Sequence, residues 1–231
     1  MINANKLFYW DIETAGKYSD FNSFSKNDER GAHLFEGKVK RKQKQNPNDL
    51  QWTGTVDECY QKNASLIAEY GRIVCISYAY YNTDGSLKLG SIKNEDESLL
   101  IKEAKKVFDQ VHSVNLTLCG YNIKSFDIPW VFKKMCMNGI VPSGNISTYN
   151  KKPWDITCLD LMEFWKSSSY ESVTFDEMAY SLGVPSPKSE MDGTMVHAYF
   201  YAGRINDIVK YCEADVMALV NAAHAIANLQ S

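Results

Sequence analysis

Two carboxylates end an apolar, aromatic run near the start of the chain, in the stretch Leu7–Thr14 (LFYWDIET). If this stretch is a strand, Asp11 and Glu13 point to the same face of the sheet because they are two positions apart. Burying two like charges side by side is costly, since each raises the pKa of the other and both lose hydration. A hard divalent cation such as Mg2+ would relieve that repulsion by taking both carboxylates as ligands. The pair therefore indicates a metal site, although a solvated strand end gives the same pattern.

A third carboxylate, Asp127, follows the segment Gly120–Phe126 (GYNIKSF), in which the pattern changes from the end of a strand to the start of a helix. At such a position the free backbone N–H groups and the helix dipole favour an ionised side chain, so simple capping also explains it. Asn122 and Phe126 suit the binding of a nucleotide, through an amide hydrogen bond and base stacking, or else pack within the loop.

The last expected helix carries Tyr211 and Asp215, which are four positions apart and hence lie on one face. Asp215 borders the apolar stripe of this helix instead of lying opposite it. A carboxylate in that place needs a partner, and both a metal ion and a salt bridge are candidates.

The elements that must position these side chains alternate between strands and helices. We expect strands at 6–12, 72–81, 87–92, 115–120 and 154–159 and helices at 56–68, 95–112, 127–138, 174–182, 195–201 and 204–229. This order predicts an α/β fold with a mixed sheet of about five strands and helices on both faces. We expect residues 1–231 to form a single domain.

The segment at about 14–54 is polar and contains Gly16, Gly31, Gly37, Pro47 and Gly54, which predicts an irregular insertion. Within it, Lys38 to Lys44 (KVKRKQK) holds five basic residues in seven. Two interpretations remain open for this run: a solvated, mobile loop, or an arm that contacts phosphate groups beside the acidic site.

The composition sets limits on the class of protein. Hydrophobic residues make up 45% of the 231 residues and charged residues 23%, as in globular proteins rather than disordered ones. A net charge of −3 argues against a protein that coats nucleic acid, but not against an enzyme that grips a few nucleotides. Six cysteines without a C-x-x-C pair predict free thiols in a reducing compartment. The sequence has no pattern of a signal peptide or a membrane span, so we expect a cytoplasmic location and no membrane partner.

Taken together, the motifs D-I-E-T from Asp11, N-x3-F-D-x-P from Asn122 and Y-x3-D from Tyr211 resemble those of the DEDD 3′–5′ exonucleases. The chain is similar to stand-alone relatives of the proofreading exonuclease domain of family B DNA polymerases. One branch of the superfamily has a histidine five residues before the last aspartate, where this chain has Lys210. The tyrosine four residues before Asp215 matches the other branch, DEDDy. The resemblance implies a ribonuclease H-like fold.

The resemblance also implies a site with two divalent metal ions, Mg2+ or Mn2+. Its metal ligands would be Asp11, Glu13, Asp127 and Asp215. Asp11 would bridge both ions, Glu13 and Asp215 would complete the one on the nucleophile side, and Asp127 would hold the other. Tyr211 would join these four as a catalytic residue and orient the attacking water, since a hydroxyl with an ordinary pKa near 10 suits a donor. The implied substrate-binding residues are Thr14, Asn122, Phe126 and Lys188, the last of which would face phosphate.

The expected activity is metal-dependent 3′–5′ hydrolysis of single-stranded DNA from its 3′ end, which releases nucleoside 5′-monophosphates. One alternative is a 3′–5′ exoribonuclease acting on short RNA, because the same centre can cleave both and only contacts to the 2′-OH distinguish them. Another is a non-catalytic nucleic-acid-binding module on the same fold. Since the sequence ends at Ser231, we expect no polymerase domain, and a replication or repair protein would act as a partner in trans.

Overall fold

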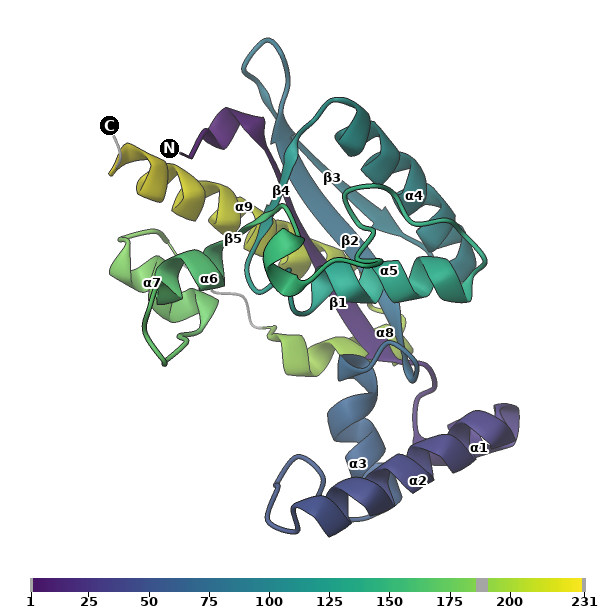
Figure 1. Ribbon diagram of the computed structural model, residues 1–231. Helices are drawn as coiled ribbons and strands as arrows, with labels where there is room; N and C mark the ends of the chain where they lie inside the picture. Colours follow the sequence, from purple (N-terminus) through teal and green to yellow (C-terminus); the bar gives the residue numbers. More distant parts are fainter. Residues whose placement is uncertain (1, 186–190, 230–231) are drawn as a thin grey trace.

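A mixed sheet of five strands forms the centre of the computed structural model, which describes residues 2–185 and 191–229 (Figure 1). The strands are β1 (Leu7–Gly16), β2 (Gly71–Tyr81), β3 (Leu87–Lys93), β4 (Thr117–Gly120) and β5 (Leu159–Asp160). Their order across the sheet is β3-β2-β1-β4-β5. β1 is antiparallel to β2 and parallel to β4, so the strand that carries the first acidic pair lies in the middle of the sheet.

Helices follow and cover these strands. They are α1 (Phe21–Asn27), α2 (Glu29–Gln45), α3 (Val56–Asn63), α4 (Glu97–Ser113), α5 (Asp127–Met137), α6 (Leu161–Lys166), α7 (Phe175–Ser181), α8 (Val196–Tyr201) and α9 (Ile205–Asn228). Short 3-10 helices occur at η1 (Ala4–Lys6), η2 (Ala64–Leu66), η3 (Pro153–Asp155) and η4 (Gly193–Met195). The α/β class and the five-stranded mixed sheet are as the sequence predicted.

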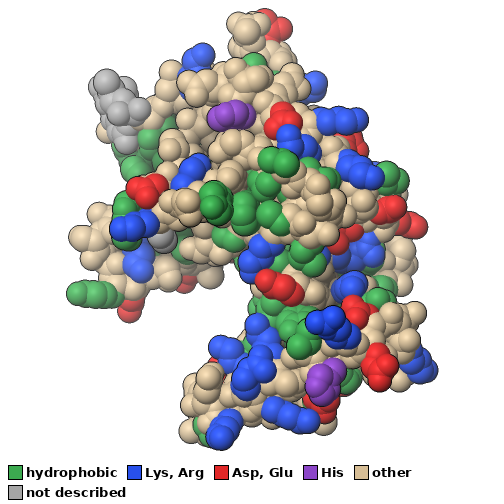
Figure 2. Space-filling model, turned by 45° about the vertical axis from the view of Figure 1, so that its right-hand side comes forward, with side chains coloured by type: hydrophobic (Ala, Val, Ile, Leu, Met, Phe, Trp, Pro, Cys, Tyr) green, Lys and Arg blue, Asp and Glu red, His purple; other side chains and the backbone are tan. Residues whose placement is uncertain are grey.

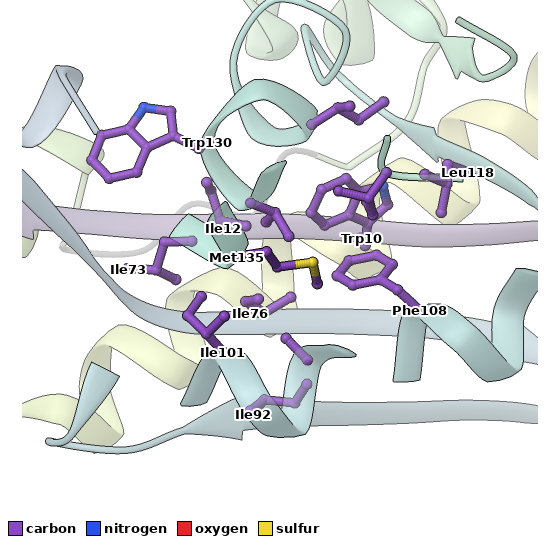
Figure 3. Packing of buried hydrophobic residues seen from close by; sticks show 14 of the residues in the cluster. Trp10, Ile12, Ile73, Ile76, Ile92, Ile101, Phe108, Leu118, Trp130 and Met135 are labelled. Atoms are coloured by element: carbon purple, nitrogen blue, oxygen red, sulfur yellow. The ribbon is translucent and has the colours of Figure 1, made fainter. Parts of the chain in front are cut away.

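The two faces of the sheet bury different halves of β1. The even-numbered side chains Phe8, Trp10 and Ile12 pack against α4 and α5, and Figure 3 shows this core. The odd-numbered side of β1 faces α9, where Tyr9 lies in a second core with Val216. Side chains alternate along a strand, so the odd-numbered acidic residues of β1 also lie on the side of α9.

Local sequence patterns predicted most boundaries of the helices and strands to within a few residues of those in the structure. Thr55 caps α3 as expected, because its hydroxyl accepts from the N–H of Glu58 while the Glu58 carboxylate accepts from the N–H of Thr55. The strand expected at 154–159 was mostly wrong. Only Leu159 and Asp160 pair with β4, and the residues of η3 form a 3-10 turn instead.

The irregular segment expected at about 14–54 was also wrong, because it contains α1 and α2. Three buried residues of α2, Ala32, Phe35 and Val39, have the spacing of one helix face. They pack with residues of α3 in a core distinct from those on the sheet. The basic run from Lys38 to Lys44 is therefore helical rather than a loop. We call α1, α2 and α3 with their connections (residues 17–63) the helical arm, which lies beyond one end of the sheet in Figure 1.

All six cysteines are free, as the sequence predicted. Within the described parts of the chain, no helix combines the length and the apolar character needed to cross a lipid bilayer. Two of the four histidines have structural hydrogen bonds: His197 bonds to the Gly16 N–H and the Ser19 carbonyl, and His224 bonds to the Tyr81 hydroxyl.

Candidate active site

The first two carboxylates lie on the central strand, on the side that faces α9. Glu13 is buried with 8% of its surface exposed, and Asp11 is half-buried. The pairing of β1 with β2 shifts register between Glu13 and Thr14, so the ladder is irregular at the acidic pair. Ligand atoms of Asp11, Glu13 and Cys212 all lie within 4.8 Å of one another, which makes this group the right size to surround one metal ion.

Asp127 reaches the same strand from the opposite face. It is the first residue of α5, is 2% exposed, and its Oδ1 accepts a hydrogen bond from the Ile12 N–H at 3.1 Å. Simple capping of α5 does not explain its position, because the N-cap residue is Phe126 and the Asp127 carboxylate is bound to the backbone of β1. This contact holds Asp127 next to the acidic pair.

Tyr211 and Asp215 come from α9, which packs across β1 and β2. They lie one helical turn apart, and the Tyr211 hydroxyl and the Asp215 carboxylate affect each other's pKa. Cys212, on the same helix, donates weakly from its Sγ to Asp11 Oδ2 at 3.6 Å. This face of α9 therefore closes over the acidic residues of β1.

The four carboxyl groups share one electrostatic environment. Burial raises the pKa of Asp11 to about 7, and the charge of Asp215 adds to the rise. Burial also raises the pKa of Asp215, to about 6. The pKa of Glu13 is raised by burial and then by its acidic neighbours, which include the other three carboxylates. The pKa of Asp127 is likewise raised by burial and by the charge of Asp11. The fold thus concentrates negative charge that water cannot solvate well.

The donor set of this cluster fits a hard divalent cation. Carboxylate oxygens are the ligands that Mg2+ and Mn2+ prefer, and here they come from β1, α5 and α9. Within residues 2–185 and 191–229, no ion pair to a lysine, arginine or histidine involves any of the four carboxylates. A cation bound among them would offset both their mutual repulsion and the loss of hydration.

Thr14 lies next to this cluster, but its hydroxyl is already engaged. Its Oγ1 donates to the Ser65 carbonyl at 2.6 Å, and the residue is buried with 8% exposed. This bond ties β1 to η2. A nucleotide could reach Thr14 only through its backbone or the remaining acceptor positions of Oγ1.

Asn122 and Phe126 lie in the turn between β4 and α5. Asn122 has a φ of +59°, a left-handed conformation in which asparagine is enriched among non-glycine residues. Its carbonyl accepts from the N–H of Phe126 at 3.1 Å, and the Phe126 ring is half-buried beside Trp130. Both residues therefore lie in the turn that leads into Asp127. Lys188, the fourth expected substrate contact, lies outside the described residues.

Two residues next to the site were missed at the sequence level. Asp160 is 4% exposed and accepts from the N–H groups of Asn122, Lys124 and Met162 at 2.9, 3.0 and 3.0 Å. It thereby fixes the turn that carries Asn122. Its signal was an aspartate directly between an expected strand and a helical stretch. The other missed residue is Cys212, whose thiol lies against Asp11, and no spacing rule pointed to it.

The chain matches one family model over residues 64–220, described as a predicted 3′–5′ exonuclease related to the exonuclease domain of PolB. The chain belongs to this family. The matched segment contains Asp127, Tyr211 and Asp215, whereas Asp11 and Glu13 precede it. The resemblance noted from the motifs is thus confirmed at the level of the family.

A structural comparison supports the same fold for this family member. The structure of the family B DNA polymerase from the hyperthermophilic archaeon Pyrobaculum calidifontis is similar, with a TM-score of 0.53 and 15% identity. The similarity covers 94% of this chain and 24% of the polymerase chain. The fold is therefore ribonuclease H-like, as expected. No curated protein matches the chain.

Proposed function

We propose that this chain is a metal-dependent exonuclease that removes nucleotides from the 3′ end of single-stranded DNA. The observation that carries the proposal is the convergence of Asp11, Glu13, Asp127 and Asp215 on one buried cluster. Four carboxylates without a cationic side chain among the described residues are hard to explain by stability, because each raises the pKa of others. The family to which the chain belongs supports the reaction class.

The same cluster supports a site for two Mg2+ or Mn2+ ions, in the arrangement of the DEDDy branch. We assign Asp11, Glu13, Asp127 and Asp215 as their ligands. When bound, such ions supply an activated water and stabilise the negative charge that develops on the leaving oxygen. The protein's own contribution is to hold the four carboxylates at fixed positions, which the Ile12 N–H does for Asp127.

The Tyr211 hydroxyl suits the role of a hydrogen-bond donor in this centre. Burial and the charges of Asp215 and Glu13 raise its pKa, so the hydroxyl stays protonated at neutral pH. It lies near enough to Asp215 to affect the pKa of that carboxylate, and as a donor it suits a hydrogen bond to the attacking water. We assign it the positioning of that water rather than the removal of its proton.

We assign the terminal nucleotide to the space beside the turn between β4 and α5. Phe126 offers a ring for stacking, Asn122 offers amide groups, and Thr14 offers an oxygen acceptor to the terminal sugar. Lys188 remains an expected phosphate contact. Cleavage at this position releases a nucleoside 5′-monophosphate and leaves a new 3′-hydroxyl. A replication or repair protein acting in trans, in the cytoplasm, is the partner that fits such an activity.

The decisive experiment is digestion of 5′-labelled DNA and RNA oligonucleotides of identical sequence with the purified protein and Mn2+ or Mg2+. We expect stepwise shortening of the DNA from its 3′ end, slower shortening of the RNA, and no shortening in EDTA. Identification of the products as 5′-monophosphates would fix the bond that breaks. Asp11→Asn serves as the inactive control.

The alternatives give different results in the same experiment. Faster digestion of RNA would replace the DNA assignment with exoribonuclease activity. Binding of both strands without hydrolysis under any metal condition would support a non-catalytic nucleic-acid-binding module and would end the proposal.

A further inference from the structure

A cleft separates the helical arm from the body of the protein. It has a volume of about 360 Å³, which lies in the range of ~300–1,000 Å³ typical of small-ligand sites. Its walls come from α2, from residues 66–70 and from residues 125–133. Figure 2 shows the hollow between the arm and the body, with Lys and Arg side chains gathered on the arm. We call this space the arm cleft.

The arm cleft is lined by residues that are neighbours, along the chain, of residues of the candidate active site. Phe126, which lines it, is followed in the chain by Asp127. Leu66 also lines it, is 52% exposed, and follows Ser65, the residue whose carbonyl binds Thr14. We therefore expect a strand whose 3′ end lies at the carboxylates to continue into the arm cleft.

Charge in the arm cleft favours a polyanion. Lys38 and Lys133 both line it, and Lys133 pairs with Glu69 at 3.0 Å with both side chains about half exposed. Lys38 has no ion pair among the described residues and lies over the Tyr70 ring, with Nζ 5.8 Å from its centroid. Arg41 lies three residues after Lys38 on α2, and its charge acts on the hydroxyl of Tyr70, which also lines the arm cleft. Like Lys38, Arg41 has no ion pair within the described part of the chain.

The other basic residues of α2 have different surroundings. Lys40 is two positions from Lys38, about 200° around the helix, and pairs with Glu36 at 3.1 Å. Lys44 is four positions from Lys40 and shares its side. Lys42 lies over the Trp52 ring, with Nζ 5.9 Å from the centroid. Lys38 and Arg41 thus lie beside Tyr70 of the arm cleft, and Lys42 lies against Trp52. Lys40 and Lys44 point farthest from Lys38 around the helix.

We propose that the arm cleft binds the single strand upstream of its reacting 3′ end, with Lys38 and Arg41 on the phosphates and the Tyr70 ring against a base. This inference rests on the proposed function, and it assigns a role to a part of the chain outside the segment that matches the family model. Stacking and phosphate contacts of this kind bind single strands without sequence preference. The arm therefore supplies affinity for longer strands, and the carboxylates supply the chemistry.

The test compares two double variants that remove equal charge from the same helix. Lys38→Gln/Arg41→Gln removes the two charges beside the arm cleft. Lys40→Gln/Lys44→Gln removes two charges of the same helix that lie farther from it. Binding of a 5′-fluorescein-labelled 12-nucleotide oligo-dT is measured in EDTA, where hydrolysis stops. We expect the first variant to lose affinity roughly tenfold and its salt slope to fall by about 1.4, since each phosphate contact contributes about 0.7. The second variant should stay within about twofold of the unmodified protein.

Equal loss in both variants, or loss in neither, would overturn the arm-cleft assignment. Hydrolysis of the p-nitrophenyl ester of thymidine 5′-monophosphate, which is too short to reach the arm, separates this result from the proposed function. Both variants should hydrolyse the ester at the unmodified rate. If the unmodified protein fails to hydrolyse both the ester and the oligonucleotide, the nuclease proposal fails, while binding in EDTA still decides the arm cleft.

Discussion

The backbone N–H of Ile12 donates to Oδ1 of Asp127 at 3.1 Å and so joins the middle strand to the first residue of α5. β4 pairs with β1 only as far as Tyr9, so this N–H lies beyond the reach of its neighbouring strand. The carboxylate takes the place of a strand partner. Two residues 115 positions apart are thereby fixed side by side, and with them the first and second acidic motifs.

This relationship predicts different results for two substitutions of Asp127. Asp127→Asn keeps an oxygen that can accept from Ile12 but removes the charge. We expect the thermal stability in EDTA to be retained and the rate of DNA hydrolysis to fall on the order of 100-fold or more. Asp127→Ala also removes the acceptor and should cost about 1–3 kcal/mol of unfolding free energy. Denaturant unfolding and a single-turnover assay check both expectations. Equal activity of Asp127→Asn and the unmodified protein would contradict the ligand role.

The raised pKa values predict how stability depends on pH and metal. The pKa of Asp11 rises from its ordinary value of 3.8 to about 7, and that of Asp215 to about 6. The stability that protonation provides is complete below about pH 4 and is lost as the pH rises through 6 and 7. In EDTA the protein should therefore melt at a lower temperature at pH 8 than at pH 5.5.

Saturating Mn2+ should raise the melting temperature more at pH 8 than at pH 5.5, because the cation replaces the protons. At a Mn2+ concentration 100 times the dissociation constant, the melting temperature at pH 8 should rise by about 5–10 °C. Differential scanning fluorimetry measures both conditions. Asp11→Asn should melt higher than the unmodified protein in EDTA at pH 8 and gain less from Mn2+. An equal gain at both pH values would argue against a metal site at these carboxylates.

Replacing Tyr211 by Phe should slow hydrolysis while leaving metal binding nearly unchanged. The ring keeps its packing, and only the hydroxyl that lies near Asp215 is lost. Loss of one positioned donor lowers the rate by roughly 10²–10³. Rates at saturating Mn2+ and the Mn2+-induced thermal shift should be measured on the same preparation. An unchanged rate would remove the proposed role of the hydroxyl, and a lost thermal shift would place Tyr211 in metal binding instead.

Asp160 holds the turn that carries Asn122 in place, and this role can be tested by substitution. Its carboxylate accepts from three backbone N–H groups, two of them in the turn that carries Asn122. Asp160→Ala should lower the free energy of unfolding by about 2–4 kcal/mol, because buried donors lose a charged acceptor. It should also raise KM for oligonucleotides more than it lowers kcat.

Asp160→Asn retains one acceptor oxygen and should recover part of both losses. The Mn2+-induced thermal shift should stay intact in both variants, since the donors to Asp160 within the described part of the chain are backbone N–H groups of the turn and of α6. A lost shift would mean that Asp160 acts on the metal site itself.

The sequence by itself determined the local elements. Thr55 and Glu58 define the start of α3, and the alternation along β1 places Asp11 and Glu13 on one face, because these patterns depend only on neighbours in the chain. The spacing of Tyr211 and Asp215 likewise predicted that both lie on one face of a helix. α2 was missed because its apolar face is sparse and Gly31 and Gly37 interrupt it, although the N–H of Gly31 is satisfied by Asp28 within the first turn.

Only the tertiary structure decided which side chains meet. No spacing rule connects Asp127 with Ile12, or Asp160 with Asn122, since these contacts depend on where β4 and β5 end against β1. The arm cleft likewise exists only because α2, which comes early in the sequence, lies beside the start of α5. Contacts between distant segments are set by packing, and packing depends on the whole core rather than on any local pattern.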